Sequence, residues 1–148
     1  MPKYETREDV RREAKVAGWA GRFLGAVPVK TGEFSSHDFL MQKNGVVSHV
    51  LEIKCRPGVL RYENYKLSVT KWHNLIARGV ELKVPSMLVV YDDDARRMML
   101  IRASLDAGNC VEMFQRNNRP EQPPELAVVL DWEKFVSVAV IQKGRKVG

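Results

Sequence analysis

The chain has 148 residues, 45% of them hydrophobic and 28% charged, proportions that fit an ordinary globular protein with its own core. A net charge of +6 favours polyanionic partners. No apolar run approaches the roughly 20 residues of a membrane helix, the charged N-terminus lacks a signal stretch, and two cysteines are too few for a disulfide framework. We therefore expect a cytoplasmic protein with no membrane partner, folded as one domain over residues 1–148.

The first predicted element is a helix over residues 5–18, which Thr6 can cap and Gly18 can end. Its predicted buried stripe is Val10, Ala14 and Ala17, because these residues recur at i, i+4 and i+7. The glycine-rich stretch that follows predicts a short extended piece at 23–29 and a loop at 31–36.

A β-hairpin is predicted for residues 37–43 and 46–55, because the intervening Asn44-Gly45 tolerates positive φ angles. The second of these strands is rich in β-branched residues and long enough to be central in its sheet. Residues 56–64 read as a loop, and a second helix is predicted over 66–78. The residues expected to share one side of that helix are Ser68, Trp72, Leu75, Ile76 and Gly79.

The second half of the chain begins with an unbroken apolar strand over residues 86–91, which is expected to be buried on both faces. The acidic run at 92–97 predicts a turn with solvated side chains, and 98–103 an antiparallel strand. A short third helix is expected from Ser104 to about 116, then a loop at 117–125 and a strand from 125, followed by a helix or strand that the pattern does not distinguish.

These elements predict an α/β layer architecture, a mixed central sheet flanked by helices with an α-β-β-β-α-β core over about residues 5–103. Residues 104–148 are expected to form a C-terminal extension, with 143–148 frayed at its end.

Three Glu-x-Lys triplets occur in the chain, and their contexts separate them. Residues 13–15 lie on a predicted helix, where i and i+2 point about 200° apart. Residues 81–83 lie in a short link before Pro85, with no acid at the matching upstream position. Only Glu52-Ile53-Lys54 lies in a strand, where i and i+2 share a face, and only this triplet has an aspartate, Asp38, on the partner strand.

The pairing of Asp38 depends on the register of the hairpin. A regular two-residue Asn-Gly turn would place Asp38 opposite Leu51, one residue out of phase with Glu52. A three-residue loop or a bulge would place Asp38 opposite Glu52. We therefore predict an irregularity at the tip of the hairpin or along it.

Two acids and a lysine on one sheet face suit the hydrolysis of phosphodiester bonds. Mg²⁺ prefers a few carboxylate oxygens together with water and substrate phosphate, and it activates water near neutral pH. Asp38 and Glu52 can supply the carboxylates and the Ile53 carbonyl a third ligand. Lys54 can orient the attacking water or offset developing charge.

The motif His37-Asp38, thirteen residues, then Glu52-Ile53-Lys54 resembles that of the PD-(D/E)xK nuclease superfamily, over roughly residues 5–103. Within it the chain looks most like small archaeal-type Holliday junction resolvases and related phage endonucleases. His37 departs from the proline found in many members. The resemblance implies a restriction-endonuclease-like fold and a Mg²⁺- or Mn²⁺-dependent deoxyribonuclease active in DNA recombination or repair. Its nearest branch implies branched or junction DNA as the substrate. Symmetric cutting of two strands would further imply a homodimer.

Members of this superfamily often add a first-helix glutamate to the metal site, and this helix has four candidate acids. The helical wheel favours Glu13, which lies beside the predicted buried stripe, over Glu8, which projects almost opposite. A position nearer the start of the helix stays open. The remaining candidates are Glu5 and Asp9.

The second helix resembles the family helix that faces the catalytic groove, which makes Lys71 a candidate contact to phosphate or water. A solvated lysine on an amphipathic helix is the equal alternative. Further nucleic-acid contacts are predicted around the motif, either as a basic rim or as lesser candidates. These residues are Arg56, Arg61, Lys66, Tyr65 and Ser68.

Other reactive residue types are assigned to structure. The three histidines lack metal-ligand spacing, the three tryptophans are read as core or interface aromatics, and Cys55 is expected to pack on the strand face opposite Lys54. The alternative function is a non-catalytic, basic nucleic-acid-binding module on a nuclease-like fold, in which Glu52 and Lys54 form an ion pair. An adaptor for protein partners would show no salt-dependent DNA affinity.

Overall fold

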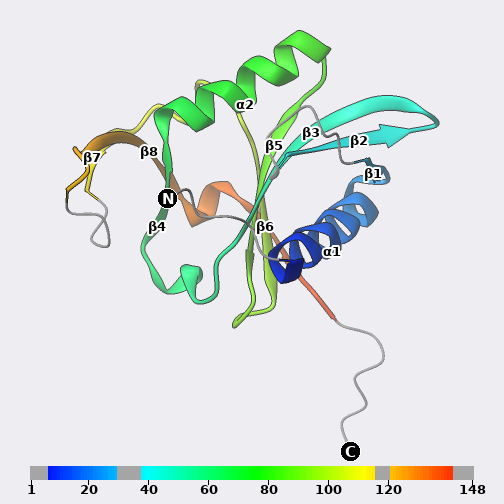
Figure 1. Ribbon diagram of the computed structural model, residues 1–148, viewed down its shortest axis with the longest axis horizontal. Helices are drawn as coiled ribbons and strands as arrows, with labels where there is room; N and C mark the ends of the chain where they lie inside the picture. Colours follow the sequence, from blue (N-terminus) through cyan, green and yellow to red (C-terminus); the bar gives the residue numbers. More distant parts are fainter. Residues whose placement is uncertain (1–6, 30–37, 116–120, 142–148) are drawn as a thin grey trace, which may run out of the picture.

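The computed structural model describes residues 7–29, 38–115 and 121–141, with the backbone but not the side chain of Asp38. Within these ranges the chain forms two α-helices, nine strands and two short 3-10 helices, arranged around a central sheet (Figure 1). The bounds are α1 Arg7–Leu24, β1 Val27–Val29, β2 Asp38–Lys43, β3 Val46–Cys55, η1 Val59–Arg61, β4 Asn64–Ser68, α2 Val69–Leu82, β5 Ser86–Asp92, β6 Arg97–Arg102, β7 Val111–Phe114, β8 Glu125–Asp131, η2 Trp132–Lys134 and β9 Val136–Ala139.

The larger sheet has six strands in the order β1-β2-β3-β5-β6-β9. Strands β3 and β5 run parallel and the other neighbours antiparallel, so the sheet is mixed, as predicted. The parallel pair arises because the chain crosses through β4 and α2 before it returns as β5. The predicted order of helix, three strands, helix and strand is confirmed, with β4 added before the second helix.

Two hydrophobic cores lie on the two faces of this sheet. On one face α1 packs against Leu51 and Ile53 of β3 and their neighbours. On the other face α2 and the smaller sheet, of strand order β4-β8-β7, pack against Val50 and the alternate residues of β5 and β6. Figure 1 shows α1 and α2 on different sides of β3 and β5. No helix in the described ranges is both long and apolar enough to cross a membrane.

Helix α1 continues to Leu24 and does not end at Gly18 as the sequence predicted. The helix ends instead before Gly25, which adopts a left-handed conformation with φ of +69°. The predicted stripe is also wrong except at Ala17, because Val10 is 39% exposed. Packing on β3 selects another helix face, and its buried residues are Glu13, Val16, Ala17, Ala20 and Gly21.

Helix α2 begins later than predicted, because residues 64–68 form β4 and pair with β8. Ser68 is the N-cap, and its hydroxyl accepts a hydrogen bond from the Lys71 N–H at 3.4 Å. The predicted inner face is confirmed for Trp72, Leu75 and Gly79, which are buried.

The predicted third helix does not form. The Ser104 hydroxyl accepts from the Ala107 N–H at 3.0 Å and closes a turn, and the Ser104 carbonyl accepts from the Trp72 indole at 3.1 Å. The chain then enters β7. The strand predicted from residue 125 is confirmed as β8, and the segment left undecided is η2 followed by β9, which joins the edge of the larger sheet. Residues 143–148 lie outside the described part.

Two glycines give a paired test of how α2 is held on the sheet. A methyl group at Gly79 would overlap the Ser86 hydroxyl, which donates to the Leu75 carbonyl at 2.6 Å, whereas a methyl at Gly18 would meet nothing within 4 Å. We expect Gly79→Ala to lower the free energy of unfolding by about 1–3 kcal/mol despite the helix propensity of alanine. Gly18→Ala should raise it by about 0.5–1 kcal/mol. Urea unfolding measures both, and equal effects would contradict this packing.

Candidate active site

The hairpin of β2 and β3 has the irregularity that the motif requires. Asn44 and Gly45 both have positive φ, 53° and 79°, as a two-residue turn of the I′ type needs. The register then shifts between Met41 and Gln42, so that Asp38 pairs with Glu52. The predicted irregularity is confirmed along the hairpin, and positions 38 and 52 therefore belong to the same face of the sheet.

Glu52 and Lys54 lie side by side in the middle of the larger sheet. Their exposed fractions are 8% and 5%, and Lys54 Nζ lies 3.4 Å from Glu52 Oε1. Strand β3 lies between β2 and β5, so neither of its edges is open to solvent. The residues of β5 that pair with Glu52 and Lys54 are Leu88 and Val90, which belong to the core under α2. The pair therefore belongs to the face of the sheet that α2 covers.

A buried ion pair of this kind is poor evidence for a stabilising role. Removing two charges from water costs several kcal/mol per ion, and an apolar pair of similar volume is often at least as stable. Strand β3 nevertheless places a carboxylate and an ammonium at positions where its neighbours are aliphatic. This favours a chemical role for Glu52 and Lys54.

The oxygen donors proposed for a metal are only partly described. The Ile53 side chain packs in the core under α1, and its backbone carbonyl is the predicted ligand. Among side chains that the structure describes, no three His, Cys, Asp or Glu residues gather closely enough to hold a metal ion. The predicted set includes Asp38, whose side chain is outside that description, so the metal set stays a prediction. An all-oxygen set fits Mg²⁺.

Glu13 is buried, at 6% exposure, on the side of α1 that faces the sheet, whereas Glu8 is exposed. The expectation that Glu13 lies near the sheet is thus confirmed, although two of the three stripe residues used to predict it, Val10 and Ala14, are exposed. Its charge acts on Cys55, which packs on the face of β3 opposite Lys54, as predicted. The structure therefore brings Glu13 to the α1 side of β3, whereas Glu52 and Lys54 belong to the other side. Glu5 and His37 lie outside the described residues.

The thiol of Cys55 is held in its protonated form. Burial raises its pKa to about 12, and the negative charges of Asp93 and Glu13 act in the same direction. A thiol with this pKa is a poor nucleophile and a poor metal ligand at neutral pH. Cys55 is therefore a packing residue beside the candidate site.

The residues predicted on the second helix are divided between two elements. Lys71 is exposed in the first turn of α2, and Ser68 is the N-cap of this helix. Tyr65 belongs to β4 and is buried at 8%, with its ring 5.9 Å from that of Trp132. Of the three, Lys71 is the residue that the structure presents to solvent.

The predicted basic rim is also divided. Arg56 and Arg61 are exposed just after β3, where their guanidinium groups donate to the Cys55 and Gly58 carbonyls at 3.0 and 3.3 Å. Lys66 is on β4, in an ion pair of 2.7 Å with Glu112 on β7 and 5.6 Å from the centre of the Phe114 ring. Arg56 and Arg61 thus lie close in sequence and space to the end of β3, and Lys66 is committed to the smaller sheet.

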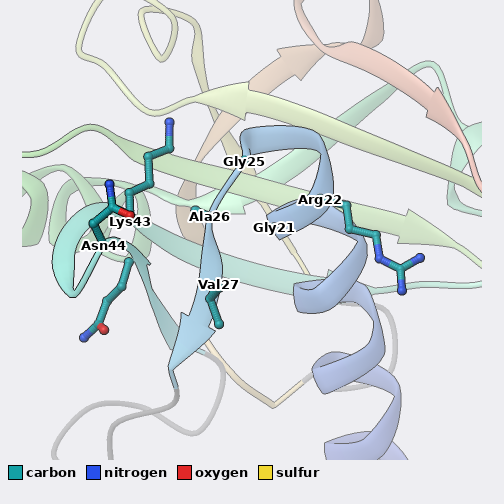
Figure 2. Close-up of a pocket in the computed structure, with 8 residues that line it drawn as sticks. Gly21, Arg22, Gly25, Ala26, Val27, Lys43 and Asn44 are labelled. Atoms are coloured by element: carbon teal, nitrogen blue, oxygen red, sulfur yellow. The ribbon is translucent and has the colours of Figure 1, made fainter.

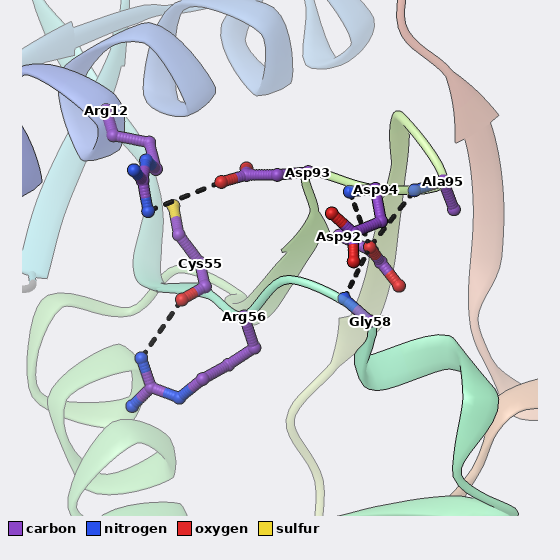
Figure 3. A network of polar contacts seen from close by, with 8 residues as sticks. All are labelled: Arg12, Cys55, Arg56, Gly58, Asp92, Asp93, Asp94 and Ala95. Atoms are coloured by element: carbon purple, nitrogen blue, oxygen red, sulfur yellow. Dashed lines mark hydrogen bonds and ion pairs between the residues drawn. The ribbon is translucent and has the colours of Figure 1, made fainter.

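The acidic run after β5 is not solvated throughout, which corrects the expectation from sequence. Asp92 is 1% exposed and accepts four backbone hydrogen bonds. Figure 3 draws those from Gly58, Asp94 and Ala95. Burial alone would raise its pKa, but the four N–H donors outweigh it and hold the pKa of this carboxyl below its ordinary 3.8. Asp92 joins the β5–β6 turn to the loop after β3. Its donors are Gly58 and Ala95 at 2.9 and 3.1 Å, Asp94 at 2.9 Å and Leu60 at 3.0 Å.

A hollow of about 390 Å³ lies between the end of α1 and the tip of the hairpin. Figure 2 shows the Arg22 and Lys43 side chains extending away from each other, and no acid among the described residues lines the hollow. It therefore lacks the groups that a hydrolytic site needs, and the candidate active site remains the Glu52–Lys54 region.

A mixed sheet between two helices, with an acid and a lysine on a central strand and an aspartate position paired to them, is consistent with the PD-(D/E)xK class of nuclease folds. The family model described as "Phage putative PDDEXK endonuclease" matches residues 1–143, and the protein belongs to this family. No curated protein matches the sequence. Membership of an endonuclease family implies nuclease activity with DNA as the substrate.

Proposed function

We propose that the protein is a Mg²⁺-dependent DNA endonuclease with Asp38, Glu52 and Lys54 at its active site. The observation that carries the proposal is the register shift in the hairpin, which pairs the Asp38 position with Glu52 on the face that also bears Lys54. The burial of the Glu52–Lys54 pair supports it, because a site with little water strengthens electrostatic interactions with a reacting phosphate.

Asp38, Glu52 and the Ile53 carbonyl would hold Mg²⁺ or Mn²⁺. When bound, the ion supplies charge neutralisation for the phosphate and a lowered pKa for the attacking water. Glu13 is the proposed further ligand from α1. Its described neighbour Cys55 lies on the face of β3 opposite Glu52 and Lys54.

Lys54 has the proposed role of orienting the attacking water. Its ammonium carries three N–H donors and no acceptor, and one of these donors can face the Glu52 carboxylate, which lies 3.4 Å away. The other donors can bind water or oppose negative charge on the phosphate in the transition state. Lys71, exposed at the start of α2, and the exposed Arg56 and Arg61 are proposed to contact DNA phosphates.

The proposed substrate is branched DNA, cut by a homodimer. The motif resembles that of junction resolvases, which act on branched DNA and cut two strands symmetrically as dimers. Plasmid, single-stranded and four-way-junction DNA, each assayed with Mg²⁺ or Mn²⁺ and then with EDTA, separate the substrates. No cleavage of any of them with either metal would overturn the proposed function.

A non-catalytic DNA-binding module is the second candidate. It is favoured by the ion pair between Glu52 and Lys54, which that reading predicts as a structural contact. The two functions differ in metal binding, because the module needs no ion at Asp38 and Glu52. Metal titration therefore discriminates between them.

Asp38→Asn is the variant for this titration. We expect Mn²⁺ affinity to fall roughly tenfold or more, because a carboxylate ligand is removed, and cleavage to fall by about 100-fold or more. Isothermal titration and a plasmid assay measure the two effects. Asp106→Asn removes an exposed acid elsewhere and should change neither. Unchanged Mn²⁺ binding in Asp38→Asn would favour the module.

A further inference from the structure

A basic groove lies where α1 meets the turn between β5 and β6. It encloses about 480 Å³, and four of its eight lining residues are Lys or Arg while two are acidic. Tyr91, one of the lining residues, pairs with Cys55 and so lies on the α1 side of the sheet, away from the face of Glu52 and Lys54. The lining residues are Glu8, Arg11, Arg12, Lys15, Trp19, Tyr91, Asp93 and Arg96.

The cations of the groove are arranged by the helix. Arg11 and Lys15 are four residues apart, which places them one above the other on α1, with their Cβ atoms roughly 5–6 Å apart. Arg96 faces them from the β5–β6 turn. All three side chains are exposed, and none forms an ion pair with a residue that the structure describes. They form a short row of charges open to an external anion.

The other groups give the groove a fixed shape. Arg12 pairs with Asp93 at 3.3 Å, which ties α1 to the turn (Figure 3). Trp19 packs on Tyr91 with ring centres 5.2 Å apart, so the groove has an aromatic part beside its row of charges. Cations beside apolar rings suit a ligand with repeated phosphates joined by less polar sugars.

We propose that this groove binds the sugar-phosphate backbone of DNA as a second binding surface, on the side of the sheet opposite Glu52 and Lys54. The identity of the ligand rests on the proposed function, since a chain that cleaves DNA meets this polyanion. The site itself rests on Arg11, Lys15 and Arg96. Phosphate contacts of this kind hold DNA without reading sequence, and their strength depends steeply on salt.

Binding without cleavage tests the groove. A labelled 30-base-pair duplex is titrated in EDTA, with fluorescence anisotropy, between 50 and 200 mM NaCl. The logarithm of the association constant falls with the logarithm of the salt concentration, and removing one cation that binds a phosphate makes this slope shallower by about 0.9. For Arg11→Gln/Lys15→Gln we therefore expect the magnitude of the slope to decrease by about 2 and the Kd at 50 mM NaCl to rise by about tenfold or more.

Arg102→Gln/Lys134→Gln is the matched control, because it removes the same charge from exposed residues at the other end of β6 and on η2. If the slope becomes shallower by the same amount in both double variants, or in neither, the inference is overturned. Arg96→Gln gives an independent measurement and should decrease the magnitude of the slope by about 1. Since no metal is present, weakened binding at the groove is distinguishable from failure of the proposed nuclease activity.

Discussion

Replacing both members of the buried pair, in Glu52→Leu/Lys54→Met, should abolish DNA cleavage and leave the protein about as stable as the wild type. The side chains lie 3.4 Å apart at 8% and 5% exposure, in a region otherwise occupied by aliphatic residues. Two apolar side chains of similar volume would avoid the cost of burying two charges. Cleavage should fall by about 100-fold or more, because both a carboxylate and the water-orienting cation are removed.

The single variants sharpen this result. Glu52→Leu leaves an ammonium buried without its carboxylate, and Lys54→Met leaves a carboxylate without its ammonium. Each should lower the free energy of unfolding by about 3–5 kcal/mol, more than the double variant does. Urea unfolding and a plasmid assay on the three proteins measure this. A double variant that is as unstable as the singles would make the pair a structural element, and one that still cleaves DNA would remove it from the active site.

Asp92→Asn should strongly destabilise the fold, although Asp92 lies outside the candidate active site. The carboxylate accepts N–H groups from both the loop after β3 and the β5–β6 turn, at distances between 2.9 and 3.1 Å. An amide cannot accept all four bonds, and it turns donor hydrogens toward N–H groups. Each buried N–H left without an acceptor costs about 1–3 kcal/mol, so a decrease on the order of 3 kcal/mol in the free energy of unfolding is expected at pH 7.

The pH dependence of this effect has a definite sign. Because the folded-state pKa of Asp92 lies below 3.8, its contribution is present above the unfolded-state pKa and is lost as the pH falls through the folded-state value. The difference in stability between wild type and Asp92→Asn should therefore shrink as the pH falls below 3.8. Urea unfolding at pH 7 and pH 3 measures it.

Asp94→Asn is the matched control, since it changes an exposed acid of the same turn and should alter stability by no more than about 0.5 kcal/mol. A difference between wild type and Asp92→Asn that stays constant with pH would contradict an ionised, hydrogen-bonded Asp92. Comparable destabilisation in the two variants would show that the charge of the turn matters more than the four hydrogen bonds.

Much of the candidate site could be predicted because its determinants are local. Asn44-Gly45 specifies a two-residue turn through its positive φ angles, and the alternation of a strand puts Glu52 and Lys54 on one face. The need for a shifted register followed from counting residues between Asp38 and Glu52. That count indicated an irregularity but could not locate it between Met41 and Gln42.

Other features could not be predicted, because they depend on which elements pack together. Residues 64–68 were assigned to a loop and a helix, and β8 makes them a strand by pairing with them from more than 50 residues away in sequence. As a result, Lys66 forms an ion pair with Glu112 and Tyr65 is buried in the core, instead of contacting DNA beside the motif as predicted. The basic groove likewise joins α1 to a turn about 80 residues later, a pairing with no local signal.

For this protein the sequence by itself determined the hairpin, the strand that carries the Glu-x-Lys pair and the order of the core elements. Turn chemistry and side-chain periodicity act over a few residues, so a single chain reveals them. Only the tertiary structure decided that Asp92 is buried and accepts four backbone N–H groups. It also decided that α1 continues past Gly18 and buries Glu13, and that Glu13 and Glu52 lie on different sides of β3. Burial depends on what covers a residue, and distant segments supply that cover.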